Sequence, residues 1–309
     1  MIGELMIRFD KKVPIFEDGN IVKIPIKIGD SEELNLLKTN KIPLDDNILR
    51  IMVLGDSYIK GGGIDFNKNF SHVLKSFLVK SNSLHYKNIY ILDMSRASNN
   101  NLDNYNTYFE YINKFKPQLV ILGYNINAVN GNLDKVDTLS VSTPPLKSSE
   151  KLSNKNTLYD LLYQSELIHL TLRNLHKYLK SYGIIFPNSV FDQVLKSYTQ
   201  NKSNWLKSKE LLSELIVHAD KNNIKIITLL CPYIDMLKYP KLFTGTESII
   251  ENYFNSFPNL IFINLREAYI GKNPDDFILS VYDGHPNEKG HLLMAKTVYP
   301  IIERNFKNN

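Results

Sequence analysis

Five short and almost uninterrupted apolar runs are the feature that most limits how this chain can fold. They lie at residues 51–54, 89–92, 119–122, 224–230 and 260–263. Continuous apolar runs of this length are typical of strands that are buried on both faces, as in a parallel sheet covered by helices. We therefore predict a parallel β-sheet built from these runs.

The segments between the first three runs have the spacing of amphipathic helices. Apolar side chains share one helix face from Phe70 to Leu78, and again from Tyr105 to Phe115, shortly before Pro117. These connections are about 30 residues long or less, which is the size of a right-handed crossover between parallel strands. The alternation predicts an α/β fold with a doubly wound parallel sheet.

The first 49 residues do not follow this alternation. Ile and Lys alternate at residues 21–28, and we interpret this stretch as an edge hairpin. The sequence thus predicts an N-terminal extension with edge strands over residues 1–49 and a main domain over residues 50–309.

A long segment, residues 131–222, separates the third and fourth apolar runs by far more than an ordinary crossover. It begins with a Ser/Thr/Pro/Lys-rich stretch at 138–155 and continues with amphipathic helical patterns at 158–179 and 205–218. Long insertions beside the carboxyl edge of a sheet often shape a substrate site. We expect a mainly helical insertion with this role.

Charge and residue content exclude several functional classes. The 37 basic and 32 acidic residues leave a net charge of +5, and the lysines are scattered, so we expect no nucleic-acid partner. Cys231 is the single cysteine, which rules out an internal disulfide framework, and we interpret it as a buried packing residue. No carboxylate or cysteine stands at metal-ligand spacing from the histidines at 72, 85, 169, 176 and 218, so we expect no metal site.

Membrane and export signals are also missing from this sequence. No apolar stretch approaches the roughly 18–20 residues that a membrane helix needs. Residues 1–8 lack the basic region followed by an apolar region that defines a signal peptide. We expect no membrane span in these residues. The compartment stays open: cytoplasmic, or extracytoplasmic if an anchor has been removed.

Ser57 follows the first predicted strand in the run Gly55-Asp56-Ser57. Open α/β sheets bind ligands at the carboxyl ends of their strands, and Gly55 permits a tight exit from the strand. The tripeptide alone is also an ordinary turn sequence. Three glycines follow at 61–63, but no Gly-Lys-Ser/Thr accompanies them, which argues against a phosphate loop. Ser57 is therefore a candidate nucleophile.

His285 follows the last predicted strand and stands two residues after Asp283. A carboxylate at this distance can bond to Nδ1 of the imidazole, which leaves Nε2 as a base. A lone histidine is more often structural, but an Asp/His pair before a helix is less often so. We assign His285 as candidate base and interpret His291 as a packing or capping residue at the start of the helix.

Asn127 lies just after the third predicted strand. Its side-chain amide can donate to an oxyanion, although a turn asparagine is the more ordinary interpretation when such a residue stands alone. Ser57, Asn127 and His285 each follow a predicted strand, so all three are expected at one edge of the sheet.

The order of these groups resembles the SGNH/GDSL hydrolase superfamily. Residues 51–63 resemble its first sequence block, residues 123–127 a variant of its third, and residues 283–287 a variant of its last with one residue between Asp and His. The likeness extends over roughly residues 48–305. Further points of similarity are Trp205, Pro232 and Tyr239-Pro240. The chain is most similar to bacterial members that are often found with envelope or exopolysaccharide genes.

The resemblance implies a flavodoxin-like sheet, no metal or organic cofactor, and esterase, deacetylase or acyltransferase activity. It implies a short acyl ester, such as acetyl on a glycan, as substrate. Ser57 would be the nucleophile, His285 the base and Asp283 its orienting carboxylate. The oxyanion would be held by the backbone N–H groups of Ser57 and Ser98 and by the amide of Asn127.

Two positions depart from the pattern of the family. Ser98 stands where the second block has a glycine, and Ala128 follows Asn127 where the family usually has aspartate. These departures favour a rival hypothesis, a non-catalytic glycan-binding or assembly protein with the same fold. The presence of Ser57, Asp283 and His285 favours catalysis. Hydrolase and acyltransferase stay open as alternatives, because they differ only in the acceptor, and the sequence identifies no protein partner.

Overall fold

The structure, a computed structural model, describes most of the main domain and little of the rest. The described residues are 16–17, 20–21, 32–39, 41–81, 83–129, 171, 175, 178, 190–199, 202–239, 243–280 and 283–307. The chain divides into two units, of which the first comprises Met1–Ile28 and Lys135–Ser189 and the second Gly29–Asp134 and Val190–Asn309. The first unit is described only at the antiparallel pair β1 (Phe16–Glu17) and β2 (Asn20–Ile21) and at three single residues.

A five-stranded parallel sheet forms the centre of the second unit, in the order β4-β3-β5-β6-β7. The strands are β3 (Ile48–Leu54), β4 (Asn88–Asp93), β5 (Leu119–Asn125), β6 (Lys225–Cys231) and β7 (Leu260–Asn264). All five apolar runs contribute to these strands, so the predicted strands are confirmed. The chain first winds outward to one side of β3 and then to the other, which is the strand order of flavodoxin-like folds. The predicted doubly wound α/β fold is thus confirmed.

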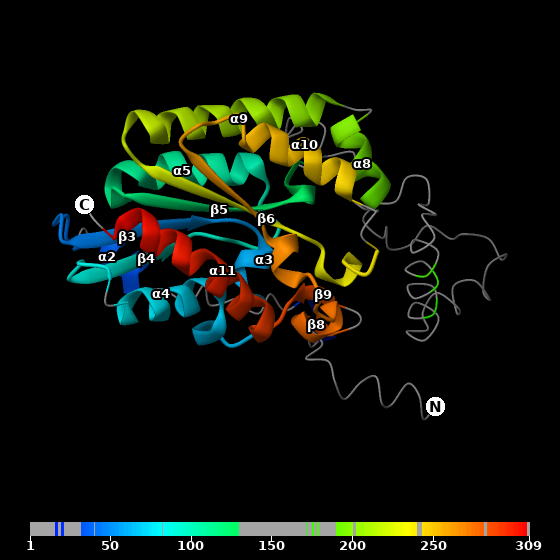
Figure 1. The fold of residues 1–309 in the computed structure, drawn as a ribbon, viewed down its shortest axis with the longest axis horizontal. Coiled ribbons are helices and arrows are strands. Elements are labelled where there is room, and N and C mark those ends of the chain that lie inside the picture. The colour runs from blue at the N-terminus through cyan, green and yellow to red at the C-terminus, as the bar shows by residue number, and fades with distance from the viewer. Residues whose placement is uncertain are drawn as a thin grey trace. The chain divides into compact units, whose positions relative to one another are not determined.

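Helices cover both faces of this sheet (Figure 1). One face packs against α4 (Phe70–Lys80) and α11 (Glu288–Phe306). The other packs against α5 (Asn101–Phe115), α8 (Val190–Thr199), α9 (Lys202–Lys221) and α10 (Thr244–Phe254), and α2 (Glu32–Lys38) contributes Leu37 to the same core. Alternate residues of β3 belong to the two cores, Met52 to one and Val53 to the other. Burial on both sides explains why the strands read as continuous apolar runs.

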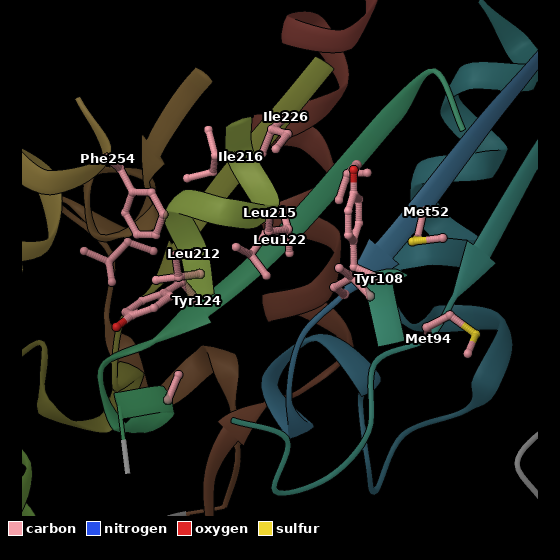
Figure 2. Close-up of a cluster of buried hydrophobic side chains, with 14 of the residues drawn as sticks. Met52, Met94, Tyr108, Leu122, Tyr124, Leu212, Leu215, Ile216, Ile226 and Phe254 are labelled. Carbon is pink, nitrogen blue, oxygen red and sulfur yellow. The ribbon is translucent and has the colours of Figure 1, made fainter. Parts of the chain in front are cut away.

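Figure 2 shows the core on the α9 side of the sheet. Leu122 and Tyr124 project from β5 towards Leu212 and Leu215 of α9. Phe254 of α10 packs in the same cluster beside Tyr124. The rings of Tyr124 and Phe254 meet edge to face, with centroids 5.3 Å apart. This packing attaches α9 and α10 to the carboxyl half of β5.

Short elements make the remaining connections. They are α3 (Ser57–Lys60), η1 (Phe66–Lys68), η2 (Ile126–Val129), η3 (Ile234–Met236), η4 (Leu265–Tyr269), η5 (Pro274–Phe277) and the antiparallel pair β8 (Ile278–Ser280) and β9 (Asp283–Pro286). No helix among the described residues is both long and apolar enough to cross a membrane.

Parts of the predicted extension and insertion lie outside the described residues. This applies to residues 22–28 of the expected hairpin and to most of the helical pattern at 158–179. Within the expected insertion, the structure describes α8 and α9, and α9 contains the helical pattern predicted at 205–218. A role of this segment in shaping a substrate site stays a prediction.

Candidate active site

Two glycines allow the turn with Ser57 to pack tightly on the ends of the central strands. A Cβ atom at Gly55 would lie 2.7 Å from Cγ1 of Ile59, and one at Gly123 only 2.1 Å from the same atom. Ile59 therefore occupies the space that side chains at both positions would need. Asp56 then caps α3, because its carboxylate accepts the N–H of Tyr58 at 2.9 Å. Ser57 becomes the first residue of a short helix at the carboxyl end of β3.

Ser57, His285 and Asp283 form a continuous chain of hydrogen bonds. Oγ of Ser57 lies 2.8 Å from Nε2 of His285, and Nδ1 of His285 lies 2.6 Å from Oδ1 of Asp283. The same carboxylate oxygen accepts the backbone N–H of His285 at 3.1 Å. Because a carboxylate can only accept, Nδ1 carries the ring proton and the lone pair of Nε2 faces the hydroxyl.

The imidazole is supported from the turn that carries the serine. The ring of Tyr58 lies 5.0 Å from that of His285, and its hydroxyl approaches the carbonyl oxygen of Gly284 at 3.4 Å. In the segment Asp283-Gly284-His285, a Cβ atom at Gly284 would lie 2.6 Å from Oδ1 of Asp235. Glycine at position 284 thus allows this segment to pack closely against η3.

Asp275 and Asp276, which precede Asp283 in the chain, make different contacts. Asp275 forms an ion pair with Lys238 at 3.5 Å, and the main-chain oxygen of Asp276 accepts from the amide of Asn287. Asn287 also caps α11, where its oxygen accepts from two backbone N–H groups. This arrangement secures the start of the helix that follows His285, while Asp283 bonds to the imidazole.

Ser98 adopts a backbone conformation that favours glycine. Its φ of 65° lies in the left-handed region, which costs a residue with a Cβ atom about 1–2 kcal/mol. The side chain is exposed, and within the described part of the chain its N–H donates to no acceptor. The loop is attached to the serine turn, since the N–H of Arg96 donates to the carbonyl of Gly55 at 3.1 Å.

Two asparagines, rather than one, lie where the chain leaves β5. Asn127 is exposed in η2, and its backbone N–H donates to Oδ1 of Asn125 at 3.3 Å. Asn125 ends β5 and is only 1% exposed, and its Nδ2 has no acceptor among the described residues. Alternate strand residues share a face, so Asn125 faces the same side as Gly123, against which Ile59 packs.

Sequence reasoning missed Asn125. The signal was available: Asn125 directly ends an apolar strand and stands two residues after a glycine, in Gly123-Tyr124-Asn125. A polar residue at the last buried position of a strand has to satisfy its amide near the sheet edge. It is therefore a second candidate donor beside Asn127.

The remaining titratable candidates lie away from this chain of hydrogen bonds. Burial raises the pKa of Cys231 well above its usual value, which makes a thiolate nucleophile unfavourable. His291 is fully buried in α11, where Nδ1 accepts the backbone N–H of Phe70 at 3.0 Å. In the described ranges, no three His, Cys, Asp or Glu side chains gather as they would around a metal ion.

Comparisons with known proteins give matches among solved structures alone. No protein-family model and no curated protein sequence matches the chain. An alpha/beta hydrolase enzyme from the metagenome of Lake Arreo, Spain, is 13% identical over 84% of this chain and 97% of its own, with a TM-score of 0.49. The psychrotrophic esterase EstA from Pseudoalteromonas sp. is 14% identical over 84% and 99%, with a TM-score of 0.45.

A third similar structure is a member of the lipolytic protein G-D-S-L family from Veillonella parvula. It is 14% identical over 83% of this chain and 99% of its own, with a TM-score of 0.43. At these scores and identities, the chemistry of the present chain has to be argued from its own site.

Proposed function

We propose that this protein is a serine ester hydrolase. The proposal rests on one observation, the chain in which Ser57 Oγ lies 2.8 Å from His285 Nε2 and His285 Nδ1 lies 2.6 Å from Asp283. A serine hydroxyl is a weak nucleophile until an adjacent base removes its proton, and the base needs a third group to hold its orientation. Ser57, His285 and Asp283 have the contacts for these three roles.

The reaction proceeds in two acyl-transfer steps. Ser57 Oγ bonds to the ester carbonyl carbon while its proton passes to His285 Nε2, and the tetrahedral oxyanion collapses with cleavage of the ester C–O bond. The leaving alcohol takes the proton from His285. Water then attacks the acyl-serine, gives a proton to His285 and releases the acid, and Ser57 recovers its proton. A sugar hydroxyl in place of water would make the protein an O-acyltransferase.

Backbone and side-chain N–H groups supply the oxyanion hole. We assign the N–H groups of Ser57 and Ser98 to it, together with an asparagine amide from the end of β5. Asn127 is the residue that the sequence predicts. The buried Nδ2 of Asn125, which has no acceptor among the described residues, favours Asn125 as the donor.

A short acyl group on a glycan is the substrate class that we propose. Support for it comes from the resemblance of residues 51–63, 123–127 and 283–287 to the sequence blocks of the SGNH/GDSL superfamily. An acetyl group is the first to test, since a p-nitrophenyl acetate assay and an O-acetylated glycan share the same acyl-enzyme.

The proposal is tested with the purified full chain on both substrates. Ser57→Ala and His285→Ala should abolish turnover, and Ser57→Ala should abolish labelling by a fluorophosphonate. Ser248→Ala and His85→Ala make the same chemical changes at exposed positions and should retain activity. Activity that survives Ser57→Ala would overturn the mechanism. A wild-type protein without turnover or labelling would favour the non-catalytic glycan-binding rival.

The two asparagines are separated by alanine variants. Loss of one oxyanion donor lowers kcat by about 10²–10³ and leaves KM nearly unchanged, because the oxyanion exists mainly in the transition state. We expect this result for Asn125→Ala and an effect below about five-fold for Asn127→Ala. The reverse pattern would assign the donor to Asn127.

A further inference from the structure

Two buried tyrosines connect α8 to the turn that holds the asparagines. The hydroxyl of Tyr198 in α8 lies 2.9 Å from the carbonyl oxygen of Ile126 and 2.8 Å from the hydroxyl of Tyr124. Tyr198 is 2% exposed, and Tyr124 of β5 is fully buried. Ile126 stands between Asn125 and Asn127, so this contact reaches the backbone between the two candidate donors.

The direction of these hydrogen bonds follows from the number of protons. A carbonyl only accepts, so the single hydroxyl proton of Tyr198 goes to Ile126. The oxygen of Tyr198 then accepts from Tyr124. Burial raises the pKa of Tyr124 to about 12 and that of Tyr198 well above its usual value, so both phenols keep these protons at neutral pH.

The same peptide group also contacts the side chain of Asn125. The carbonyl of Ile126 and the N–H of Asn127 belong to one rigid plane. Tyr198 holds one end of that plane, and the other end donates to Oδ1 of Asn125 at 3.3 Å. With its oxygen turned to Asn127, the amide of Asn125 leaves Nδ2 as its free donor.

We propose that Tyr198 is a positioning residue that orients the amide of Asn125 through the peptide between Ile126 and Asn127. The inference rests on the proposed hydrolase function and adds to it a residue from the segment between the third and fourth strands. Without the Tyr198 hydroxyl, the buried carbonyl of Ile126 loses its donor. The peptide plane can then rotate, and Oδ1 of Asn125 loses the N–H that orients it.

The test replaces single hydroxyl groups and follows kcat and KM separately. Tyr198→Phe should lower kcat about ten- to a hundred-fold, the effect of a misplaced rather than absent catalytic group, with KM changed less than two-fold. Tyr253→Phe is the control, because its partly buried hydroxyl donates to the carbonyl of Lys209 in α9 and forms no hydrogen bond with the asparagines. It should leave kcat within two-fold of the wild type.

A double-mutant cycle separates positioning from general loss of structure. In an Asn125→Ala background, Tyr198→Phe should cause no further fall in kcat, because the amide on which it acts is gone. An equal fall in both backgrounds, or the same fall for Tyr253→Phe, would overturn the inference. Fluorophosphonate titration of Ser57 corrects each kcat for the folded fraction.

Two further results separate this inference from the hydrolase proposal. If Tyr198→Phe does not fold, Tyr124→Phe can replace it, because it removes the donor to Tyr198. Tyr124→Phe should lower kcat when Asn125 is present and should have no effect in the Asn125→Ala background. If Asn127→Ala rather than Asn125→Ala causes the large fall in kcat, the positioning role of Tyr198 is contradicted while the hydrolase proposal stands. If the wild type shows no Ser57-dependent turnover or labelling, both fall together.

Discussion

Two residues near Ser57 are held in energetically unfavourable states, one in its backbone conformation and one in the burial of its carboxyl group. Ser98 has a left-handed backbone, and the carboxyl of Asp56 is buried next to Ser57, the proposed nucleophile. Burial raises the pKa of Asp56 to about 6, against the smaller opposing effects of the Tyr58 N–H and of His285. Such states are more common at functional sites than elsewhere, where selection for stability alone removes them.

Ser98→Gly should stabilise the protein, since glycine adopts a positive φ without a Cβ penalty. Part of the gain is lost to the greater freedom of glycine in the unfolded chain, so we expect the free energy of unfolding to rise by about 0.5–1 kcal/mol. Ala97→Gly is the control: its φ is not positive, and the same replacement should destabilise the same loop. Chemical denaturation measures both. Equal changes of the same sign would contradict the backbone argument.

Helices α4 and α11 support the segments that carry Ser57 and His285. Helix α4 follows the serine turn, α11 follows His285, and both lie on one face of the sheet. His291 joins their first turns, because its Nδ1 accepts the N–H of Phe70 and its Nε2 faces Gly61. We therefore expect this buried contact to support the positions of Ser57 and His285, although it lies outside their hydrogen-bonded chain.

His291→Ala should weaken the contact between α4 and α11 and destabilise the protein. Removing the imidazole leaves a cavity and an unsatisfied N–H at Phe70, so the free energy of unfolding should fall by about 2–4 kcal/mol. Labelling of Ser57 by a fluorophosphonate should slow as well. The exposed His85→Ala should change stability by less than about 0.5 kcal/mol. A stability of His291→Ala equal to that of the control would show that the contact is unimportant.

At the scale of the whole molecule, two buried groups link stability to pH with opposite signs. Asp56, with its pKa raised from 3.8 to about 6, binds more proton in the folded state, so between these values stability falls as pH rises. Burial lowers the pKa of His291 from 6.5 to about 4, so there the unfolded state binds more proton and stability rises with pH. Each group contributes at most about 1.4 kcal/mol per pH unit.

Single variants should therefore tilt the stability profile in opposite directions between pH 4 and 6. Relative to the wild type, Asp56→Asn should make the free energy of unfolding rise more steeply with pH, and His291→Asn should make it rise less steeply or fall. Asn keeps an acceptor for the Tyr58 or Phe70 N–H in each case. Urea unfolding at several pH values measures the differences, and parallel profiles for all three proteins would refute the assignment.

The sequence by itself determined the strands, the fold class and the approximate edge of the site. Short continuous apolar runs are typical of strands covered on both faces, and parallel strands place their carboxyl ends at one edge of the sheet. Ser57 directly follows the first run, and His285 was placed beyond the last run, so the two were predicted at one edge. The structure brings His285 there from β9 of a separate two-stranded sheet. The resemblance marked position 98 as one where the family has glycine, and the structure shows the positive φ of Ser98 that glycine adopts without penalty.

Only the tertiary structure decided how the asparagines and their supports are arranged. Local periodicity tells which face a strand residue occupies, but the strand continues to Asn125 because of its pairing with β6, opposite Cys231. This extension buries Asn125 and leaves Asn127 exposed in the following turn. Tyr198 is 72 residues from Ile126 in the chain, and no sequence pattern connects them. Their contact exists because α8 packs over the end of β5, and the gain in buried surface outweighs the entropy cost of bringing together residues so far apart in the chain.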